Sequence, residues 1–188
     1  MSEPLDAAQT GSRHGGPSFS LGNRVERAAF AVIWRLSGWL VPPPFGWGWR
    51  RFLLQLFGAQ LGTGARVYPS ARIWLPRNLV MEPWSSIGPG VQCYNQARIA
   101  LGEGAIVSQR AFLCSGDHDH RDPAHQLVTR PIVIEAGAWV AAEAFVGPGV
   151  TIGKDAVLGA RGCAMKDIPP ATVWAGNPAA QVAERQVR

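Results

Sequence analysis

The side chains best suited to chemistry in this 188-residue chain gather in one short polar segment. Three of its four histidines and three of its aspartates lie between residues 117 and 125: Asp117, His118, Asp119, His120, Asp122 and His125. Imidazole changes its charge near neutral pH, so one of these histidines could accept the proton of an alcohol as that alcohol attacks a thioester. A neighbouring carboxylate could orient the ring. The segment is therefore a candidate site for general-base catalysis.

The same residues also fit two other interpretations. His118 and His120 form a His-x-His pair, and in an extended segment both rings would lie on one face. His125 or an aspartate could then complete a zinc site. A plain solvated polar loop would need no function at all. The local residues alone leave the general base, the metal site and the loop open.

The polar segment interrupts a six-residue repeat. From Ile134 the chain divides into IEAGAW, VAAEAF, VGPGVT, IGKDAV and LGARGC, and the first place is always aliphatic. Neither an α-helix, with its period of 3.6, nor a single strand, with its period of 2, produces a period of six. Three such repeats close one triangular coil of about eighteen residues, so the repeat predicts an all-β solenoid. Each first-place aliphatic that is fully buried contributes about 1.5–3 kcal/mol before entropy is counted.

The upstream half carries the same period with two phase shifts. It begins at Leu61, slips near residues 78–81 and slips again before Leu101. The period then fails over residues 114–131, the polar excursion that holds the histidines. Functional residues often lie on such excursions from a rigid scaffold. The prediction is a β-helix over residues 59–179 with a protruding catalytic loop.

The first 58 residues differ in composition from the rest. Residues 1–20 are rich in Gly, Ser and Pro and predict a disordered tail, in which His14 is expected to be inert. Helical spacing of apolar residues predicts one helix over 21–41, and a second short helix is expected around 49–57. The helical segment 21–58 is rich in tryptophan and arginine. It could cap the solenoid, whose strand edges need cover, or lie on a membrane surface; we favour the cap.

The composition excludes several classes of protein. The net charge is +5, but the basic residues are spread along the chain and no nucleic-acid-binding motif occurs, so no nucleic acid partner is expected. The cysteines Cys93, Cys114 and Cys163 are odd in number and form no CxxC, which favours a reducing compartment. Cys93 occupies a first place of the repeat and is expected to be a buried hydrophobe. No secretory signal is predicted, so we expect a cytoplasmic location.

Four blocks of the chain carry a resemblance to a known family. They are WRRFLLQLFGAQLG from Trp49, LCSGDHDHRDP from Leu113, PIVIEAGAWVAAEAFVGPGVTIG from Pro131 and KDIPPATVWAGNPA from Lys166. Together they resemble the hexapeptide-repeat acyltransferases, and most of all the polysaccharide O-acetyltransferases of the colanic-acid-biosynthesis type. Maltose, galactoside and nodulation-factor acetyltransferases are more distant relatives. The resemblance implies a left-handed parallel β-helix with an N-terminal helical cap, followed by a C-terminal tail or short helix over residues 180–188.

The same resemblance implies an activity and partners. The family uses acetyl-CoA and forms homotrimers with active sites between subunits. For this chain it implies an acetyl-CoA-dependent O-acetyltransferase that acts on a hydroxyl of a sugar or polysaccharide precursor. Peripheral contact of the tryptophan-rich segment 21–58 with a membrane stays open beside it.

The resemblance also assigns roles to single residues. His118, in GDHD, matches the catalytic base of the family, and Asp117 and Asp119 become candidates for orienting its ring. Asn95 matches a position that binds the acceptor in several relatives. A backbone N–H near Ala142 is the expected donor to the oxyanion.

Cofactor contacts and the absence of a metal follow from the same comparison. The residues that match cofactor-binding positions are Ala142, Ala160, Lys166 and Arg185. Zinc-dependent carbonic anhydrases of this fold take their ligands from histidines on the rungs, and this chain has none there, so no metal is expected. His120 and His125 depart from the aromatic residues common in the family. A non-catalytic scaffold, or a carbonic-anhydrase-like metal-binding protein using His118, His120 and His125, therefore stays as the alternative.

Overall fold

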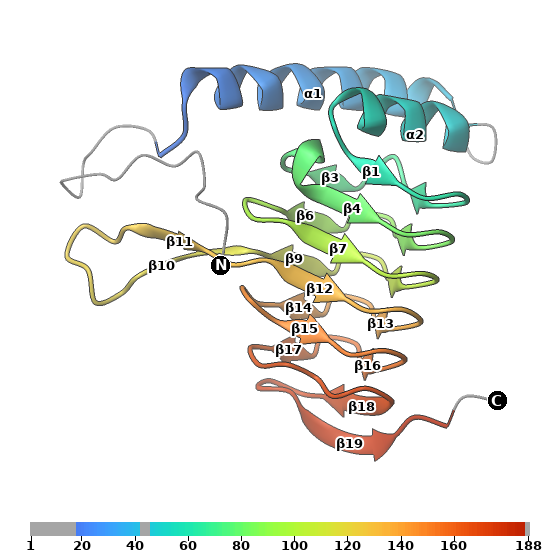
Figure 1. Ribbon diagram of the computed structural model, residues 1–188, viewed down its shortest axis with the longest axis vertical. Helices are drawn as coiled ribbons and strands as arrows, with labels where there is room; N and C mark the ends of the chain where they lie inside the picture. The colour runs from blue at the N-terminus through green and yellow to red at the C-terminus, as the bar shows by residue number, and fades with distance from the viewer. Residues whose placement is uncertain (1–17, 42–45, 187–188) are drawn as a thin grey trace.

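Three sheets of mainly parallel strands wind into a solenoid, and two helices lie across one end of it (Figure 1). The computed structural model describes residues 18–41 and 46–186, without the side chains of residues 37–39. Most of the tail predicted over residues 1–20, including His14, lies outside the described residues.

Each coil contributes one short strand to each sheet. The first sheet consists of β1 (Gln60–Leu61), β4 (Leu79–Met81), β7 (Ile99–Leu101), β12 (Ile132–Ile134) and β15 (Thr151–Ile152). The second consists of β2 (Arg66–Val67), β5 (Ser86–Ile87), β8 (Ile106–Val107), β13 (Trp139–Val140), β16 (Val157–Leu158), β18 (Thr172–Ala175) and β19 (Ala180–Glu184). The third consists of β3 (Arg72–Ile73), β6 (Gln92–Tyr94), β9 (Phe112–Cys114), β14 (Phe145–Val146) and β17 (Cys163–Ala164). Each strand lies beside the strands of the previous and the next coil.

The first-place side chains of the repeat form columns inside the solenoid. In the second sheet, Ile87 lies in register with Val67 on one side and Val107 on the other, and all three are buried. In the third sheet, Cys93 takes the equivalent place beside Leu113. It is a buried hydrophobe, as predicted, and burial raises the pKa of its thiol to about 12. The all-β solenoid predicted from the period of six is thereby confirmed.

The two phase shifts lengthen the first coils by two residues. Paired strand residues are 20 positions apart in the first coils, as in Gln60–Val80 and Val80–Ala100. They are 18 positions apart in a later coil, as in Val133–Thr151. The additional residues enlarge the corner between the third and first sheets, which in the first coil holds the short 3-10 helix η1 (Pro76–Asn78). There Asn78 Nδ2 donates to the carbonyls of Asn95 and Gln96, at 3.1 and 2.8 Å. Polar side chains thus replace strand pairing at this corner.

The helices α1 (Leu21–Leu40) and α2 (Gly46–Leu56) cover the first coil (Figure 1). Phe30 and Trp34 of α1 are buried against the solenoid, and Trp34 Nε1 donates to the Ala71 carbonyl at 3.0 Å. α1 begins as predicted, whereas α2 begins three residues before the expected Trp49. Within the two described segments, neither helix combines the length and the apolar character that crossing a membrane requires.

The C-terminus departs from the prediction of a tail or short helix over residues 180–188. Residues 180–184 form β19, which folds back and pairs antiparallel with β18. The physical reason is the open edge of β18, whose backbone groups need partners once the repeat ends. This strand therefore closes the solenoid at the end opposite to the helices (Figure 1).

Candidate active site

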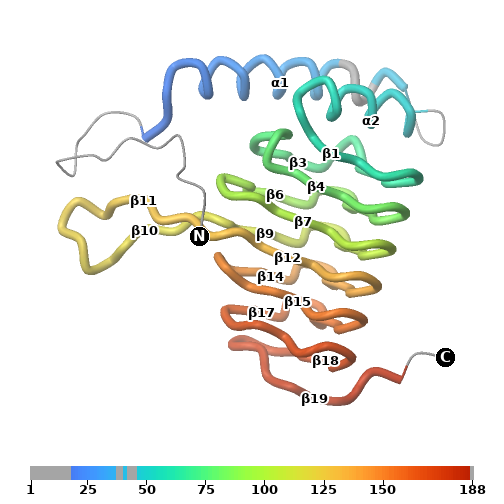
Figure 2. Tube along the Cα trace, viewed as in Figure 1, coloured from blue at the N-terminus to red at the C-terminus, as the bar shows by residue number. Residues whose placement is uncertain are grey.

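A β-hairpin projects from the side of the solenoid where the repeat is interrupted (Figures 1 and 2). It follows β9, the central strand of the third sheet, and consists of β10 (Gly116–His118) paired antiparallel with β11 (Leu127–Thr129). At its base, the carbonyl of the buried Ser115 accepts a hydrogen bond from Arg130 N–H at 2.9 Å. The hairpin therefore leaves and re-enters the coil at one corner, between the third and first sheets.

Backbone hydrogen bonds fold the tip of the hairpin into a compact loop. Asp119 N–H donates to the Gln126 carbonyl at 2.9 Å, and His125 N–H donates to the Asp122 carbonyl at 2.8 Å. The carboxylate of Asp122 also accepts from Ala124 N–H at 2.9 Å. At His125 the backbone has a φ of 49°, in the left-handed region that residues other than glycine rarely adopt. The carbonyl of His125 is thereby turned toward β10.

The ring of His118 contacts this loop through one nitrogen. Nδ1 of His118 lies 2.6 Å from the carbonyl oxygen of His125. Because a carbonyl oxygen only accepts hydrogen bonds, the proton of the neutral ring belongs on Nδ1, and Nε2 carries the free lone pair. The side chain is exposed, so a substrate can reach Nε2. This is the arrangement that a general base needs.

The two aspartates predicted to orient the ring contact other groups. Asp117 Oδ1 accepts from the backbone N–H of His118 at 2.7 Å. Asp119 accepts from the guanidinium and the backbone N–H of Arg121, and these hydrogen bonds lower the pKa of its carboxyl to about 2. In this structure neither Asp117 nor Asp119 contacts the imidazole, so their predicted orienting role gains no support. Sequence reasoning missed the carbonyl of His125 because every residue type carries one.

Asn95, predicted to bind the acceptor, is completely buried. Its Oδ1 accepts from the backbone N–H groups of Trp74 and Leu75 at 3.1 and 3.0 Å, and its Nδ2 donates to the Leu75 carbonyl at 2.7 Å. These bonds join two coils at the enlarged corner. The structure gives no support to the predicted acceptor contact, because the amide group is occupied within the solenoid.

The residues predicted to bind the cofactor lie at all three corners of the solenoid. Ala142 and Ala160 lie one coil apart between the second and third sheets, and the exposed Lys166 lies between the third and first. Arg185 lies at the remaining corner, where its Nη1 donates to two backbone carbonyls, both at 2.9 Å. One chain therefore brings Ala142, Ala160 and Lys166 to the edges of the third sheet and leaves Arg185 apart from them.

The histidines do not assemble into a metal site. Across residues 18–41 and 46–186, no three side chains of His, Cys, Asp or Glu are close enough to share a metal ion. Nδ1 of His118 is engaged by the His125 carbonyl, and His120 is exposed on the loop. The positions of the histidines thus give no support to the metal-binding alternative.

Sequence comparison places the chain among known proteins. It is 40% identical over 137 residues to WcaF of Escherichia coli strain K12, whose name assigns it to colanic acid biosynthesis as an acetyltransferase. That alignment covers 73% of this chain and 75% of WcaF. The chain belongs to the hexapeptide-repeat acetyltransferases. A second relative, nodulation protein L of Rhizobium leguminosarum bv. viciae, is 31% identical over 134 residues. That alignment covers 70% of each of the two chains. No family model matches the chain.

Solved structures agree with this acetyltransferase in fold. A maltose O-acetyltransferase from Clostridium difficile 630 superimposes with a TM-score of 0.77 at 20% identity, over 89% of this chain and 90% of that one. A hexapeptide-repeat acetyltransferase from Vibrio cholerae O1 biovar eltor, in complex with acetyl coenzyme A, has a TM-score of 0.76 at 23% identity. The superposition covers 92% of this chain and 95% of that one. The predicted left-handed parallel β-helix is therefore the fold of this acetyltransferase.

Proposed function

We propose that this acetyltransferase transfers the acetyl group of acetyl-CoA to a hydroxyl of a sugar or polysaccharide precursor, with His118 as the general base. The observation that carries the proposal is the 2.6 Å contact between His118 Nδ1 and the His125 carbonyl, which leaves Nε2 as an exposed proton acceptor. The name of WcaF supports a polysaccharide precursor as the acceptor. The acetyl coenzyme A in the Vibrio cholerae structure supports the donor.

The proposed reaction proceeds within a ternary complex. Nε2 of His118 takes the proton of the acceptor hydroxyl while its oxygen bonds to the thioester carbonyl carbon. Negative charge gathers on the carbonyl oxygen, and a backbone N–H near Ala142 stabilises it. The C–S bond then breaks, and the CoA thiolate takes the proton back from Nε2. Throughout, Nδ1–H donates to the His125 carbonyl, which stabilises the transient imidazolium.

In this proposal the cofactor lies along the third sheet, on the side of the hairpin that faces the C-terminus. The small side chains of Ala142 and Ala160 let the pantetheine arm approach the backbone. The ammonium group of Lys166, exposed at the facing edge of that sheet, attracts the phosphates of CoA. Arg185 lies at a different corner, so it could reach a cofactor only on a neighbouring copy.

A homotrimer is part of the proposal for this reason. A site built on one face of a single solenoid stays open on its outer side, and a second copy would close it. Light scattering on purified protein is expected to give three times the 20.2 kDa of the chain. An active monomer would contradict a shared site while leaving the role of His118 intact.

The test of the function is a thiol-release assay with acetyl-CoA against a panel of sugars and lipid-linked glycans. We expect His118→Ala to lower kcat by about 100-fold or more, because general-base catalysis contributes about 10²–10⁴ in rate. Binding of CoA and the oligomeric state should not change. His120→Ala is the matched control and should retain activity, because that ring lies exposed on the loop. Undiminished turnover in His118→Ala would overturn the proposal.

A further inference from the structure

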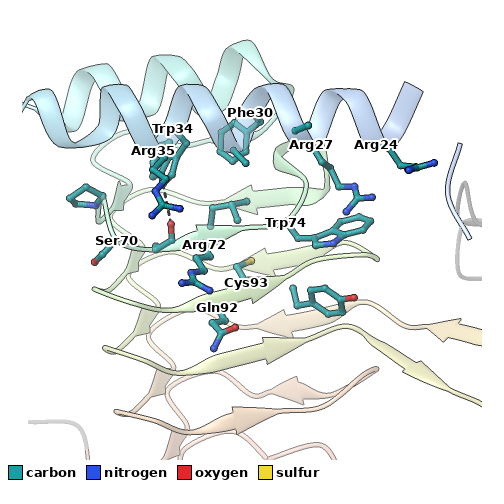
Figure 3. A pocket seen from close by; sticks show the side chains of 16 residues that line it. Arg24, Arg27, Phe30, Trp34, Arg35, Ser70, Arg72, Trp74, Gln92 and Cys93 are labelled. Carbon is teal, nitrogen blue, oxygen red and sulfur yellow. Dashed lines mark hydrogen bonds between the residues drawn. The ribbon is translucent and has the colours of Figure 1, made fainter. Parts of the chain in front are cut away.

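A cleft of about 900 Å³ lies between α1 and the first two strands of the third sheet (Figure 3). The buried side chains of Phe30 and Trp34 form part of its apolar lining, and residues of β3 and β6 form the facing wall. Its volume falls in the range of pockets that enclose a small organic ligand. None of the roles described above uses this cleft.

The lining of the cleft is strongly basic. It contains four arginines and no acidic side chain: Arg24, Arg27, Arg35 and Arg72. Three come from α1 and Arg72 comes from β3, so arginines from two elements line the cleft along its length (Figure 3). Within the described part of the chain, none of the four forms a salt bridge, and the nearby acid Glu26 pairs with Arg77 instead.

The uncompensated charge affects the cleft itself. Burial lowers the pKa of the Arg27 guanidinium; Tyr94 raises it in part, and the positive charge of Arg24 lowers it. Like charges held together in a cleft repel one another, so an anion bound between them would relieve the repulsion. Guanidinium groups bind phosphate oxygens through paired hydrogen bonds. The lining therefore suits a phosphate group.

Aromatic groups beside the arginines add directed contacts. The guanidinium carbon of Arg27 lies 4.2 Å from the centroid of the Trp74 ring, which holds that cation in place. Tyr94 also lines the cleft, and its Oη accepts a hydrogen bond from Gln96 Nε2 at 2.9 Å. The exposed amide of Gln92 lies on the same wall (Figure 3).

The cleft adjoins the catalytic hairpin. In the third sheet, Tyr94 of β6 lies directly beside Cys114 of β9, two residues before the hairpin begins at Gly116. Neighbouring strands lie about 4.8 Å apart, a step comparable to one sugar ring. The cleft lies on the cap side of the hairpin, whereas Ala142 and Ala160 lie on the other side. A ligand in the cleft would thus approach His118 from the side opposite to the proposed cofactor.

We propose that the arginine cleft binds a phosphate or diphosphate group of the acceptor, so that the natural acceptor is a phosphate-linked saccharide rather than a neutral sugar. This inference rests on the proposed acetyl transfer. The saccharide extends from the cleft to Nε2 of His118, and the arginines bind the anionic end. A soluble sugar diphosphate and a lipid-linked saccharide share this chemistry.

The first test is calorimetric titration of the full-length protein with inorganic pyrophosphate. We expect binding that persists at saturating CoA and weakens with added salt, because the two anions occupy different places. Arg72→Gln should weaken it about tenfold, as should Arg35→Gln on the other wall. Arg66→Gln is the matched control: Arg66 begins β2 of the same coil, is likewise exposed, and lies outside the cleft.

The second test compares acceptors in the thiol-release assay. Each sugar is offered as a neutral methyl glycoside, linked to a nucleoside diphosphate, and linked through a diphosphate to a polyprenol in micelles. We expect kcat/KM to be at least about tenfold higher for a diphosphate-linked form, and Arg72→Gln to remove that preference while Arg66→Gln keeps it. Whichever of the two diphosphate forms is preferred identifies the source of the phosphate.

The outcomes separate this inference from the proposed function. If neutral glycosides are acetylated as well as the diphosphate-linked forms, or if CoA displaces pyrophosphate, the inference falls and acetyl transfer stands. If pyrophosphate binds as expected but no sugar in any form is acetylated, the proposed function falls while the anion site stands. Equal pyrophosphate affinity in Arg72→Gln, Arg35→Gln and the parent protein would also overturn the inference.

Discussion

The carbonyl oxygen of His125 lies 2.6 Å from Nδ1 of His118, and it does so because His125 adopts a left-handed backbone conformation. In the proposed mechanism, the group that acts at position 125 is therefore the backbone and not the imidazole. The tautomer of His118 is set by the conformation of a loop. In the proposed mechanism, proton transfer depends on how well that loop is held.

The effect of a substitution at His125 on kcat is expected to depend on how well the new residue adopts the left-handed backbone conformation. His125→Asn should leave kcat within about twofold, because asparagine keeps the carbonyl and tolerates a positive φ. His125→Val should lower kcat about tenfold or more, because a β-branched residue in this conformation costs about 1–3 kcal/mol and displaces the carbonyl. The KM for acetyl-CoA should change little in either variant. Equal loss in both, measured by thiol release, would show that the imidazole of His125 takes part.

Asp119 is expected to titrate far below an ordinary aspartate. Its hydrogen bonds with Arg121 lower the pKa of the carboxyl from 3.8 to about 2. Because the pKa is lower in the folded protein, the stabilisation is fully present above about pH 4 and is lost as the pH falls toward 2. Carboxyl chemical shifts in an NMR titration should show this, and Arg121→Gln should return the midpoint toward 3.8. A midpoint near 3.8 in the parent protein would mean that Asp119 and Arg121 do not pair in solution.

Asn95→Ala is expected to destabilise the fold and to leave acceptor binding unchanged. The substitution removes the hydrogen bonds to Trp74 and Leu75 and takes from the backbone N–H of Leu75 its hydrogen-bond acceptor, which costs about 1–3 kcal/mol. Denaturant unfolding measures this loss, with the exposed Gln109→Ala as a control that should change stability little. A raised KM for the acceptor with unchanged stability would instead support the acceptor-binding role.

Cys93 and Cys114 are expected to differ in reactivity. Burial raises the pKa of the Cys93 thiol to about 12, so at pH 8 it has almost no reactive thiolate. Burial also raises the pKa of Cys114, which is only half-buried. A thiol reagent should therefore modify Cys93 only after unfolding, and Cys93→Ala should leave the reaction of the native protein unchanged. If native Cys93→Ala reacted with less thiol reagent than the native parent protein, Cys93 would have to lie at the surface.

The solenoid could be predicted from the sequence because its period is unlike that of any other element. One aliphatic residue in every six, as at Ile134 and Val140, has a place only in stacked coils. β19 was missed because its pairing depends on the free edge of β18 rather than on its own residues. The burial of Asn95 could not be predicted, because the family match gives a position but not the direction of a side chain.

The arginine cleft could not be predicted, for a related reason. Arg24, Arg27 and Arg35 were visible only as part of a basic, tryptophan-rich segment, and nothing in their spacing points to Arg72. Arg72 belongs to a strand 37 residues after Arg35, and only the docking of α1 on the first coil brings them to one cleft. Local sequence patterns do not record such contacts between distant elements.

The outer face of the helical cap bears on the membrane contact that the sequence left as an alternative to a plain cap. α1 exposes a stripe of apolar side chains away from the solenoid: Leu21, Val25, Val32, Leu36 and Leu40. Phe52 and Leu56 of α2 are also exposed. Residues 21–56 contain five arginines and one glutamate, so they carry four of the five net positive charges of the chain. An apolar stripe with basic flanks fits a surface of anionic lipid.

Vesicle sedimentation tests this contact directly. The full-length protein should sediment with vesicles of phosphatidylglycerol and phosphatidylcholine more than with phosphatidylcholine alone, and salt should weaken the binding. Leu36→Asn, at a side chain that is 66% exposed, should lower the affinity about tenfold because it removes apolar area from the stripe. Val182→Asn removes a side chain that is 62% exposed on β19, at the opposite end of the solenoid, and should have no effect. Equal losses of vesicle affinity in the two variants, or no sedimentation of the parent protein, would mean that the cap only covers the solenoid.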